Sequence, residues 1–278
     1  MLPLEVCGLT KTYPAFQLKN VSFAVRPGEI MGFIGRNGAG KTTTLKCLLN
    51  FVHPDGGQVR FFGKELHQAE QQIKQRIGFV SGGVDAYPRK KLDTLTAVTR
   101  RFYTDWDDRE YQRFMHRFAL DGSKTQLQLS AGMRVKYALT LAMSHHAQLL
   151  ILDEPTSGLD PVSRDDLLDE FLALSREGVS ILFSTHITSD LDKCADSITY
   201  IRQGEIRASM PLDSFVNGYR CLSLEEKQLT DALRPRLIGL KTAKHGYTAL
   251  IQTTDAQALG LQAEPATLEA AMIHLEKE

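Results

Sequence analysis

Apolar residues in the first two hundred positions either alternate with polar ones or cluster in short runs, a pattern that indicates a β-sheet. Residues 4–9 and 21–25 alternate, which predicts strands with one buried face. Other short runs are almost wholly apolar, as in strands buried on both faces of a parallel sheet. These runs cover residues 29–34 and 149–152. Residues 180–185, centred on Ile181-Leu182-Phe183, predict another buried strand, and shorter strand patterns lie at 58–62 and 77–80.

Apolar residues spaced three and four apart predict helices between these strands. The first helix covers residues 43–51, and a second pattern extends over 93–120 with a break at 104–108. The acidic residues at that break fit helix caps better than metal ligands. Ser130 is a suitable N-cap for a helix that extends to about residue 146, and Asp160 for a helix beginning at Pro161.

The pattern changes in the last part of the chain, where we expect a separate small domain. Residues 219–224, 237–240 and 248–251 are strand-like, and residues 266–275 form a helix with one apolar face. The sequence therefore predicts an α/β domain at 1–214, with a helical insertion at about 82–147. A small α+β domain follows at 215–278.

Composition and charge narrow the class of protein. The 278 residues contain 33 Lys plus Arg and 33 Asp plus Glu, and this zero formal charge argues against a nucleic-acid binder. No apolar run approaches the roughly 18 residues of a membrane span, and the N-terminus lacks a signal-peptide pattern. The four cysteines are scattered without a C-x-x-C pair, which indicates reduced thiols. We expect a cytoplasmic protein.

The strongest chemical signal is the glycine-rich loop Gly35-Arg36-Asn37-Gly38-Ala39-Gly40-Lys41-Thr42. It matches the phosphate-loop pattern G-x-x-x-x-G-K-[ST] at every fixed position. A chance glycine turn is the alternative, but strand, loop and helix follow here in the required order. Lys41 can reach the β- and γ-phosphates, while Thr42 can offer its hydroxyl to Mg²⁺. The predicted nucleotide-binding residues of this segment are Gly35, Asn37, Gly38, Ala39, Gly40, Lys41, Thr42 and Thr43.

Two carboxylates follow the apolar run at 149–152, at the strand end where open α/β sheets bind ligands. Asp153 can hold Mg²⁺, and Glu154 can orient or deprotonate an attacking water. A pair of capping acids is the alternative, and it fits the preceding apolar run less well. His186 ends the strand at 180–185; such a histidine is usually structural, but here it can also contact a γ-phosphate and the attacking water.

Three other features each have a structural and a functional interpretation. The Ser130 helix start is a second possible anion-binding end. Tyr13, in a predicted turn at 11–14, is either an ordinary half-buried turn residue or a platform for adenine, and alone it favours the ordinary interpretation. His145 and His146 lie near a helix end, where a cation suits the dipole, and we interpret them as structural.

Taken together, the segments over about residues 4–211 resemble the nucleotide-binding subunit of an ATP-binding cassette (ABC) transporter. Residues 35–42 match its Walker A motif and 149–154 its Walker B motif with the catalytic glutamate, Glu154. The resemblance implies a P-loop NTPase fold with an antiparallel β subdomain and a helical subdomain, and it implies ATP and Mg²⁺ as cofactors. It further implies that Tyr13 stacks on adenine, that Ser130 and Gly132 belong to the signature motif, that Asp160 lies in the D-loop and that His186 is the switch histidine.

The chain departs from the family pattern at two places. The signature has Ala131 for a glycine and Met133 for the glutamine, but it keeps Ser130 and Gly132, which in the family approach the γ-phosphate. The glutamine of the Q-loop, which contacts Mg²⁺ and the attacking water, falls at Gly82, so a water or Ser81 would have to replace it. Slow or differently coupled turnover is one expected consequence.

In this family two ATP-binding subunits pair head to tail, so we expect a homodimer or a pair with a second ATP-binding subunit. The expected function is an ATPase that drives a membrane permease subunit from the inner face of the cell membrane. A weak resemblance of residues 215–278 to the appendage of ABC-2 exporters favours export. The alternatives are a soluble ABC ATPase acting on ribosomes or DNA, and a regulatory subunit with weak hydrolysis. The resemblance implies no nucleic-acid partner for the transporter subunit.

Overall fold

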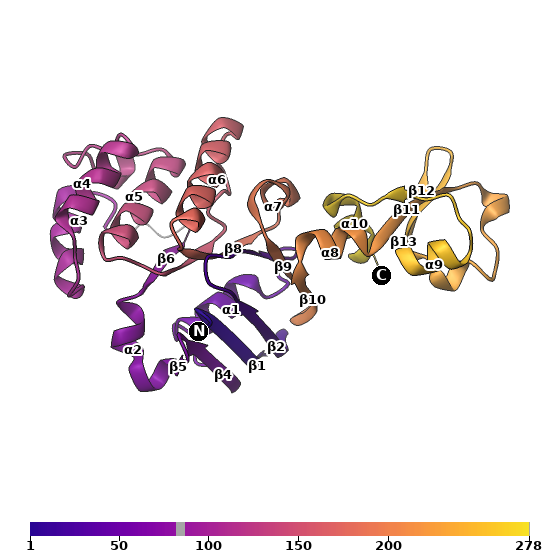
Figure 1. The fold of residues 1–278 in the computed structure, drawn as a ribbon, viewed down its shortest axis with the longest axis horizontal. Helices are drawn as coiled ribbons and strands as arrows, with labels where there is room; N and C mark the ends of the chain where they lie inside the picture. Colours follow the sequence, from indigo (N-terminus) through magenta and orange to yellow (C-terminus); the bar gives the residue numbers. More distant parts are fainter. Residues whose placement is uncertain (82–86, 278) are drawn as a thin grey trace. The chain divides into compact units, whose positions relative to one another are not determined.

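The computed structural model describes residues 1–81 and 87–277 and divides the chain into two compact units, Met1–Ser209 and Met210–Glu278. Figure 1 shows the chain coloured from indigo at its N-terminus to yellow at its C-terminus. Two sheets lie in the larger unit and a third in the smaller one. In the described part of the chain, none of the helices has both the length and the apolar character needed to cross a bilayer.

The first sheet is antiparallel, with strand order β2-β1-β4-β5. Its strands are β1 (Leu4–Tyr13), β2 (Phe16–Val25), β4 (Gly56–Phe61) and β5 (Lys64–Glu65). The predicted turn at 11–14 is wrong, because Tyr13 still pairs with Phe16 and the chain reverses at Pro14 and Ala15. A tertiary contact extends β1: Asp55 accepts hydrogen bonds from the Thr12 N–H (2.6 Å) and from the amine of Lys11 (2.7 Å).

The second sheet has six strands in the order β10-β9-β3-β8-β7-β6. Its strands are β3 (Ile30–Ile34), β6 (Ile77–Ser81), β7 (Leu149–Asp153), β8 (Ser180–Thr185), β9 (Ser197–Arg202) and β10 (Glu205–Pro211). Strands β3, β6, β7, β8 and β9 pair in parallel, and β3, β7 and β8 are buried along their whole length. The apolar runs therefore predicted the centre of this sheet correctly.

Helices cover the parallel sheet on both faces (Figure 1). The helices of this unit are α1 (Lys41–Leu48), α2 (Leu66–Lys74), α3 (Leu92–Thr99), α4 (Asp108–Arg117), α5 (Ala131–Ser144), α6 (Pro161–Arg176) and α7 (Thr188–Cys194). Helix α1 lies between the two sheets, because Leu45 shares one buried cluster with Phe61 of β4 and Phe33 of β3. On the opposite face Leu191 of α7 packs against Gly32 of β3, where a side chain would collide with it.

Helices α3, α4 and α5 form a subdomain with its own core, together with the 3₁₀ turns at Arg100–Phe102 and Gln126–Gln128. Inside it, the buried hydroxyl of Thr96 lies 3.1 Å from the Tyr111 oxygen and 2.9 Å from the Tyr137 oxygen. Asp107 begins α4 by accepting the N–H groups of Arg109 and Glu110, which lowers the pKa of Asp107. Asp107 is a helix cap, as predicted, whereas the carboxylate of Asp108 accepts hydrogen bonds from the Trp106 indole and the Arg100 guanidinium.

His145 has a different electrostatic state from the one expected at a helix end. Its ring stacks on Tyr103 with centroids 3.7 Å apart, and Nδ1 lies 3.0 Å from the carbonyl oxygen of Gln75. Burial lowers the pKa of His145 to about 4, so the ring is neutral at pH 7. The expected cation is therefore wrong for His145, while its structural role is confirmed.

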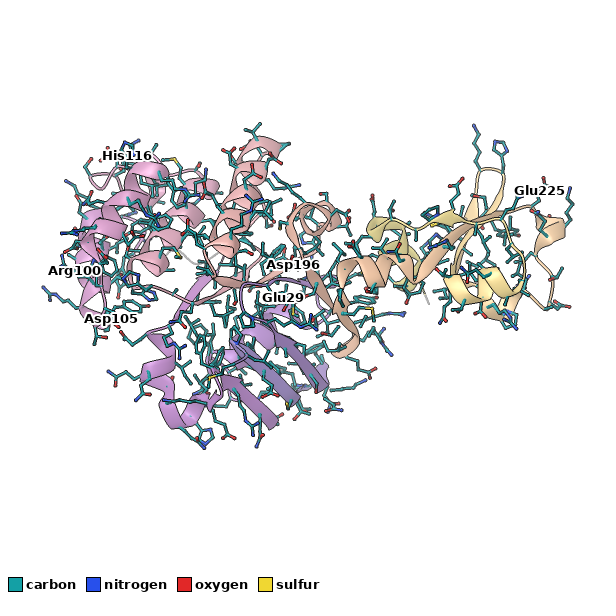
Figure 2. The ribbon with its side chains drawn as sticks, viewed as in Figure 1. Glu29, Arg100, Asp105, His116, Asp196 and Glu225 are labelled. Atoms are coloured by element: carbon teal, nitrogen blue, oxygen red, sulfur yellow. The ribbon has the colours of Figure 1, made fainter. Side chains whose placement is uncertain are left out.

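Two carboxylates close the amino ends of the central strands. Glu29 accepts a hydrogen bond from the Arg26 N–H at 2.6 Å, and Asp196 accepts one from the Ile30 N–H at 2.8 Å. Figure 2 labels both side chains at this end of β3 and β9. Because backbone N–H groups already occupy both carboxylates, we expect ligands to bind at the opposite, carboxyl end of the sheet.

The smaller unit is an α+β fold around a sheet with the order β12-β13-β11-β14. Its elements are α8 (Leu212–Asn217), β11 (Tyr219–Leu224), β12 (Ile238–Ala243), β13 (Gly246–Gln252), α9 (Thr253–Ala258), β14 (Glu264–Pro265) and α10 (Leu268–Leu275), with 3₁₀ turns at Glu226–Gln228 and Arg234–Arg236. Leu222, Leu224 and Ile251 lie at the centre of its core. The predicted strands and C-terminal helix are present; α8, α9 and β14 lacked a clear periodic signal.

Candidate functional site

The glycine-rich loop links β3 to α1 through backbone conformations that favour glycine. Gly38 and Gly40 have φ angles of 82° and 116°, in the left-handed region. A Cβ atom on Gly40 would lie 2.7 Å from Cδ2 of Leu18 and 2.8 Å from Cζ of Phe16, so the loop also packs closely on β2. The tight curl turns the loop and the first N–H groups of α1 toward one cavity.

Lys41, the first residue of α1, is only 5% exposed. Its Nζ lies 2.7 Å from the carbonyl oxygen of Gly35 and 3.4 Å from that of Arg36. A third partner is Oε1 of Glu154, at 3.1 Å. The amine of Lys41 therefore joins the glycine-rich loop to the residue that follows β7.

Asp153 ends β7 beside the start of α1. Its Oδ1 accepts a hydrogen bond from the Thr42 hydroxyl at 3.2 Å and one from the Ser184 hydroxyl at 2.7 Å. One carboxylate and one hydroxyl, both hard oxygen donors, form the kind of set that binds Mg²⁺ alongside a phosphate. In the described residues no cluster of three or more acids, histidines or cysteines is arranged to hold a metal.

Glu154 lies at the centre of the site. Its φ is 52°, an uncommon value for a residue with a side chain, and its N–H donates to the Ser184 oxygen at 2.9 Å. While Oε1 contacts Lys41, Oε2 lies 2.8 Å from Nδ1 of His186. Lys41, Glu154 and His186, far apart in the sequence, are thus joined through one carboxylate.

These contacts border a cavity of about 690 Å³. Its lining residues are Tyr13, Ala15, Phe16, Arg36, Asn37, Gly38, Gly40, Lys41, Thr42, Thr43, Glu154, Ser157 and His186. Gly35 and Asp153 are linked to this lining through Lys41 and Thr42, and Ala39 is buried within the loop. Most of the predicted nucleotide site is therefore together in one place.

Three other predicted site residues neither line this cavity nor belong to the segments that border it: Ser130, Gly132 and Asp160. Ser130 begins α5, where its hydroxyl accepts the Met133 N–H at 3.2 Å. Asp160 begins α6 by accepting the N–H groups of Val162 and Ser163, and the contacts with Ser163 lower its pKa. A Cβ atom on Gly132 would lie 3.5 Å from Cβ of Ser163, so these residues form a second group where α5 meets the start of α6.

Gly82, the position of the family's Q-loop glutamine, lies outside the described residues. Ser81 precedes it as the last residue of β6 and pairs with Asp153 in the parallel register. Its backbone is therefore next to the candidate Mg²⁺ ligand, at the same edge of the sheet.

Sequence reasoning missed Ser184, which contacts both acidic residues at the end of β7. Its signal is a buried serine directly after Ile181-Leu182-Phe183, two positions before His186. Phe16, Arg36 and Ser157 also line the cavity without having been predicted to do so. Turns and strand pairing place these residues at the cavity. Neither produces a periodic pattern that a single sequence would reveal.

A family model described as ABC transporter matches residues 18–157, half of the chain. The chain belongs to the ABC transporter family. It is 29% identical over 258 residues to ABC transporter ATP-binding protein YtrB of Bacillus subtilis (strain 168), covering 91% of this chain and 88% of that protein. It is 33% identical over 208 residues to Nod factor export ATP-binding protein I of Burkholderia pseudomallei (strain 1710b), covering 73% and 68%.

A solved structure described as an ATP binding subunit of an ABC transporter superposes with a TM-score of 0.69 at 29% identity. The superposition covers 77% of this chain and 91% of that one. The expected family, P-loop fold and ATPase activity are thereby confirmed. This chain is an ATP-binding subunit that hydrolyses ATP to energise membrane transport.

Proposed function

We propose that this chain energises an exporter and that its ATP occupies the 690 Å³ cavity beside the glycine-rich loop. The observation that carries the proposal is the contact of one carboxylate, Glu154, with both Lys41 and His186 at the edge of that cavity. Export is supported by the relative named as a Nod factor export protein. The specific cargo belongs to the membrane partner.

In this proposal the nucleotide is held from both ends. Tyr13, 40% exposed at the end of β1, stacks on the adenine, and an aromatic contact of this kind contributes on the order of 1 kcal/mol. The glycine-rich loop and the N-terminus of α1 bind the phosphates through the predicted residues 35–43. Lys41 then exchanges Glu154 for a phosphate oxygen.

Thr42 and Asp153 would hold Mg²⁺, which is consistent with their oxygen donors lying 3.2 Å apart. When bound, Mg²⁺ neutralises charge on the β- and γ-phosphates. Ser184 keeps the carboxylate of Asp153 in place through its 2.7 Å hydrogen bond.

Glu154 acts as the general base. Its carboxylate accepts a proton from the attacking water as the water oxygen bonds to the γ-phosphorus and the bond from that phosphorus to the β-phosphate oxygen breaks. His186 orients this carboxylate through Nδ1, 2.8 Å from Oε2, and because His186 also lines the cavity its ring contacts the γ-phosphate in this proposal. Because an ionised carboxylate only accepts hydrogen bonds, Nδ1 of His186 carries the proton in this contact.

Ser130, Gly132 and Asp160 act on the ATP of a second ATP-binding subunit. Support comes from their place outside the cavity of their own chain, grouped where α5 meets the start of α6. The second subunit is another copy of this chain or a related one. In a two-fold pair each ATP then lies between the loop of one subunit and the Ser130 helix of the other.

The remaining partner in this proposal is an integral membrane permease subunit. The chain then works in the cytoplasm, bound to the inner face of the cell membrane. Affinity purification of the full chain from detergent-solubilised cells tests this: co-purification of a hydrophobic membrane protein is expected. Recovery with ribosomes or DNA instead would refute it.

The catalytic assignment is tested with Glu154→Gln and Lys41→Ala. The first removes the base while leaving the loop intact, so kcat falls by about 100-fold or more while ATP binding persists. Size-exclusion chromatography with light scattering should show an ATP-dependent dimer for Glu154→Gln and none for Lys41→Ala. A Glu154→Gln protein that turns over ATP at the wild-type rate contradicts the assignment.

A further inference from the structure

Helix α7 contains a buried acid that the function described above does not use. Asp190 is 1% exposed and lies on the buried side of α7 with Leu191 and Cys194. Burial raises the pKa of Asp190, against smaller opposite effects of Thr156, Arg164, His186 and Thr185. It does not line the ATP cavity. An acid placed so deeply destabilises a fold unless its contacts compensate.

One oxygen of Asp190 has a short hydrogen bond. Oδ2 accepts the hydroxyl of Thr156 at 2.6 Å, and Thr156 is itself 1% exposed. Thr156 belongs to the loop between β7 and α6, two residues after Glu154. Asp190 lies in the helix that follows β8, four residues after His186. The hydrogen bond therefore joins the segment that contains Glu154 to the segment that contains His186.

The other oxygen is poorly compensated. Oδ1 lies 3.9 Å from Nε of Arg164, and both atoms are buried without a hydrogen-bond partner among the described residues. That distance is too long for a hydrogen bond. A buried carboxyl group with one oxygen that lacks a hydrogen bond lowers the stability of a fold, which points to a role for Asp190 beyond stability.

The link has a geometric consequence for the site. Glu154 has a left-handed φ of 52°, and its side chain must meet Nδ1 of His186 at 2.8 Å. The two residues lie on different segments beyond the ends of β7 and β8, where the sheet ladder no longer holds them. Within the loop, the Ser157 N–H donates to the Glu154 carbonyl at 3.1 Å and the Leu159 N–H to that of Thr156 at 3.3 Å. Fixing Thr156 thus fixes the turn that begins at Glu154.

We propose that Asp190 is a positioning residue for ATP hydrolysis, which holds the Glu154 loop against the start of α7 through Thr156. The proposal rests on the proposed roles of Glu154 and His186. Neither Asp190 nor Thr156 lines the ATP cavity; in this proposal they set the position of the base relative to the histidine. Removing the link leaves nucleotide binding intact but lets the carboxylate leave its productive position, and displacements of about 1 Å in such groups can cost 100-fold in rate.

The test compares Thr156→Val, which keeps the shape and deletes the hydroxyl, with Thr156→Ser, which restores a hydroxyl. For the full-length protein with ATP and Mg²⁺, Thr156→Val should lower kcat by about 10- to 100-fold with KM for ATP changed less than about twofold. Thr156→Ser should recover kcat to within about threefold of wild type. Asp190→Asn keeps an acceptor for Thr156 and should also retain most of kcat, whereas Asp190→Ala should behave as Thr156→Val.

Thr199→Val is the matched control, because Thr199 is 0% exposed in β9 and its hydroxyl bonds Ser209 rather than the site. It should lower the melting temperature without lowering kcat. The double variant Thr156→Val with Asp190→Ala should be no slower than either single variant, because both break one link. If Asp190→Ala does not fold, Thr156→Val and Thr156→Ser decide the question alone.

Wild-type kcat in Thr156→Val, or a loss of kcat that Thr156→Ser does not restore, overturns the positioning role. Glu154→Gln separates this outcome from failure of the catalytic assignment. An inactive Glu154→Gln beside a fully active Thr156→Val refutes only the positioning role. An active Glu154→Gln refutes the catalytic assignment itself, whatever the Thr156 variants do.

Discussion

Replacing Ser184 by alanine deletes the one hydroxyl that joins Asp153 to Glu154. Ser184 is 0% exposed; its hydroxyl donates to Oδ1 of Asp153 at 2.7 Å and accepts the Glu154 N–H at 2.9 Å. A hydrogen bond to a charged group contributes about 1.5–3 kcal/mol, and leaving the Glu154 N–H unsatisfied costs about 1–3 kcal/mol more. The vacated volume is too small for a water to replace the hydroxyl. We therefore expect a loss of about 3 kcal/mol.

For a unit of about 200 residues each kcal/mol corresponds to about 2–4 °C, so the melting temperature should fall by about 6–12 °C. Differential scanning calorimetry of the full-length protein measures this, with the ATPase rate recorded in parallel. Ser189→Ala is the control, since Ser189 is exposed in α7. It should change the melting temperature by less than about 1 °C, as surface substitutions usually do. A Ser184→Ala transition within 2 °C of wild type would show that the hydroxyl bridge is energetically unimportant.

Three further predictions follow from contacts of single residues. Lys41→Ala should weaken binding of a fluorescent ATP analogue by about 10-fold or more, because a charged contact to phosphate is lost; unchanged affinity would place the phosphates elsewhere. Tyr13→Ala should weaken ATP binding by about fivefold and Tyr13→Phe hardly at all, as expected for stacking of about 1 kcal/mol; equal losses in both would point to the hydroxyl instead. Burial lowers the pKa of His145 from 6.5 to about 4, so the folded state takes up this proton less readily than the unfolded state. Stability should therefore be complete above pH 6.5 and fall by up to about 3 kcal/mol as the pH drops from 6.5 to 4. His145→Phe should have a shallower loss of melting temperature over that range, and an identical slope would refute the assignment.

Those parts of the fold and the site that have a local sequence signal could be predicted from the sequence. The strand predicted at residues 180–185 is β8 with the same limits, and Asp160 and Ser130 cap the helices that follow them. Each of these signals lies within a few residues of the feature it predicts. The glycine-rich loop is the strongest example, because its fixed spacing encodes both the turn and the chemistry.

Contacts between segments that lie far apart in the sequence could not be predicted. Thr42 meets Asp153 across 111 positions and Thr156 meets Asp190 across 34, and no periodicity relates such pairs. At Tyr13 the strand continues through pairing with Phe16 of β2, and Asp55, more than 40 positions away, adds hydrogen bonds to Lys11 and Thr12. For His145, proximity to a helix end suggested a charge, but burial against Tyr103 outweighs the helix dipole.

The three contacts of the Lys41 amine bear on the order of events in the cycle. An ammonium group has three protons, and those of Lys41 face Gly35, Arg36 and Glu154. A phosphate oxygen can gain this amine only by displacing a partner, and Glu154 is the one with a side chain free to leave. In the proposed cycle, nucleotide binding is therefore coupled to release of Glu154, because a phosphate oxygen and the Glu154 carboxylate compete for the same amine. By reciprocity, whatever frees Glu154 tightens ATP by the same factor. In the proposed cycle the carboxylate returns to the lysine when phosphate departs, so Glu154 is again held by Lys41 before the next ATP binds.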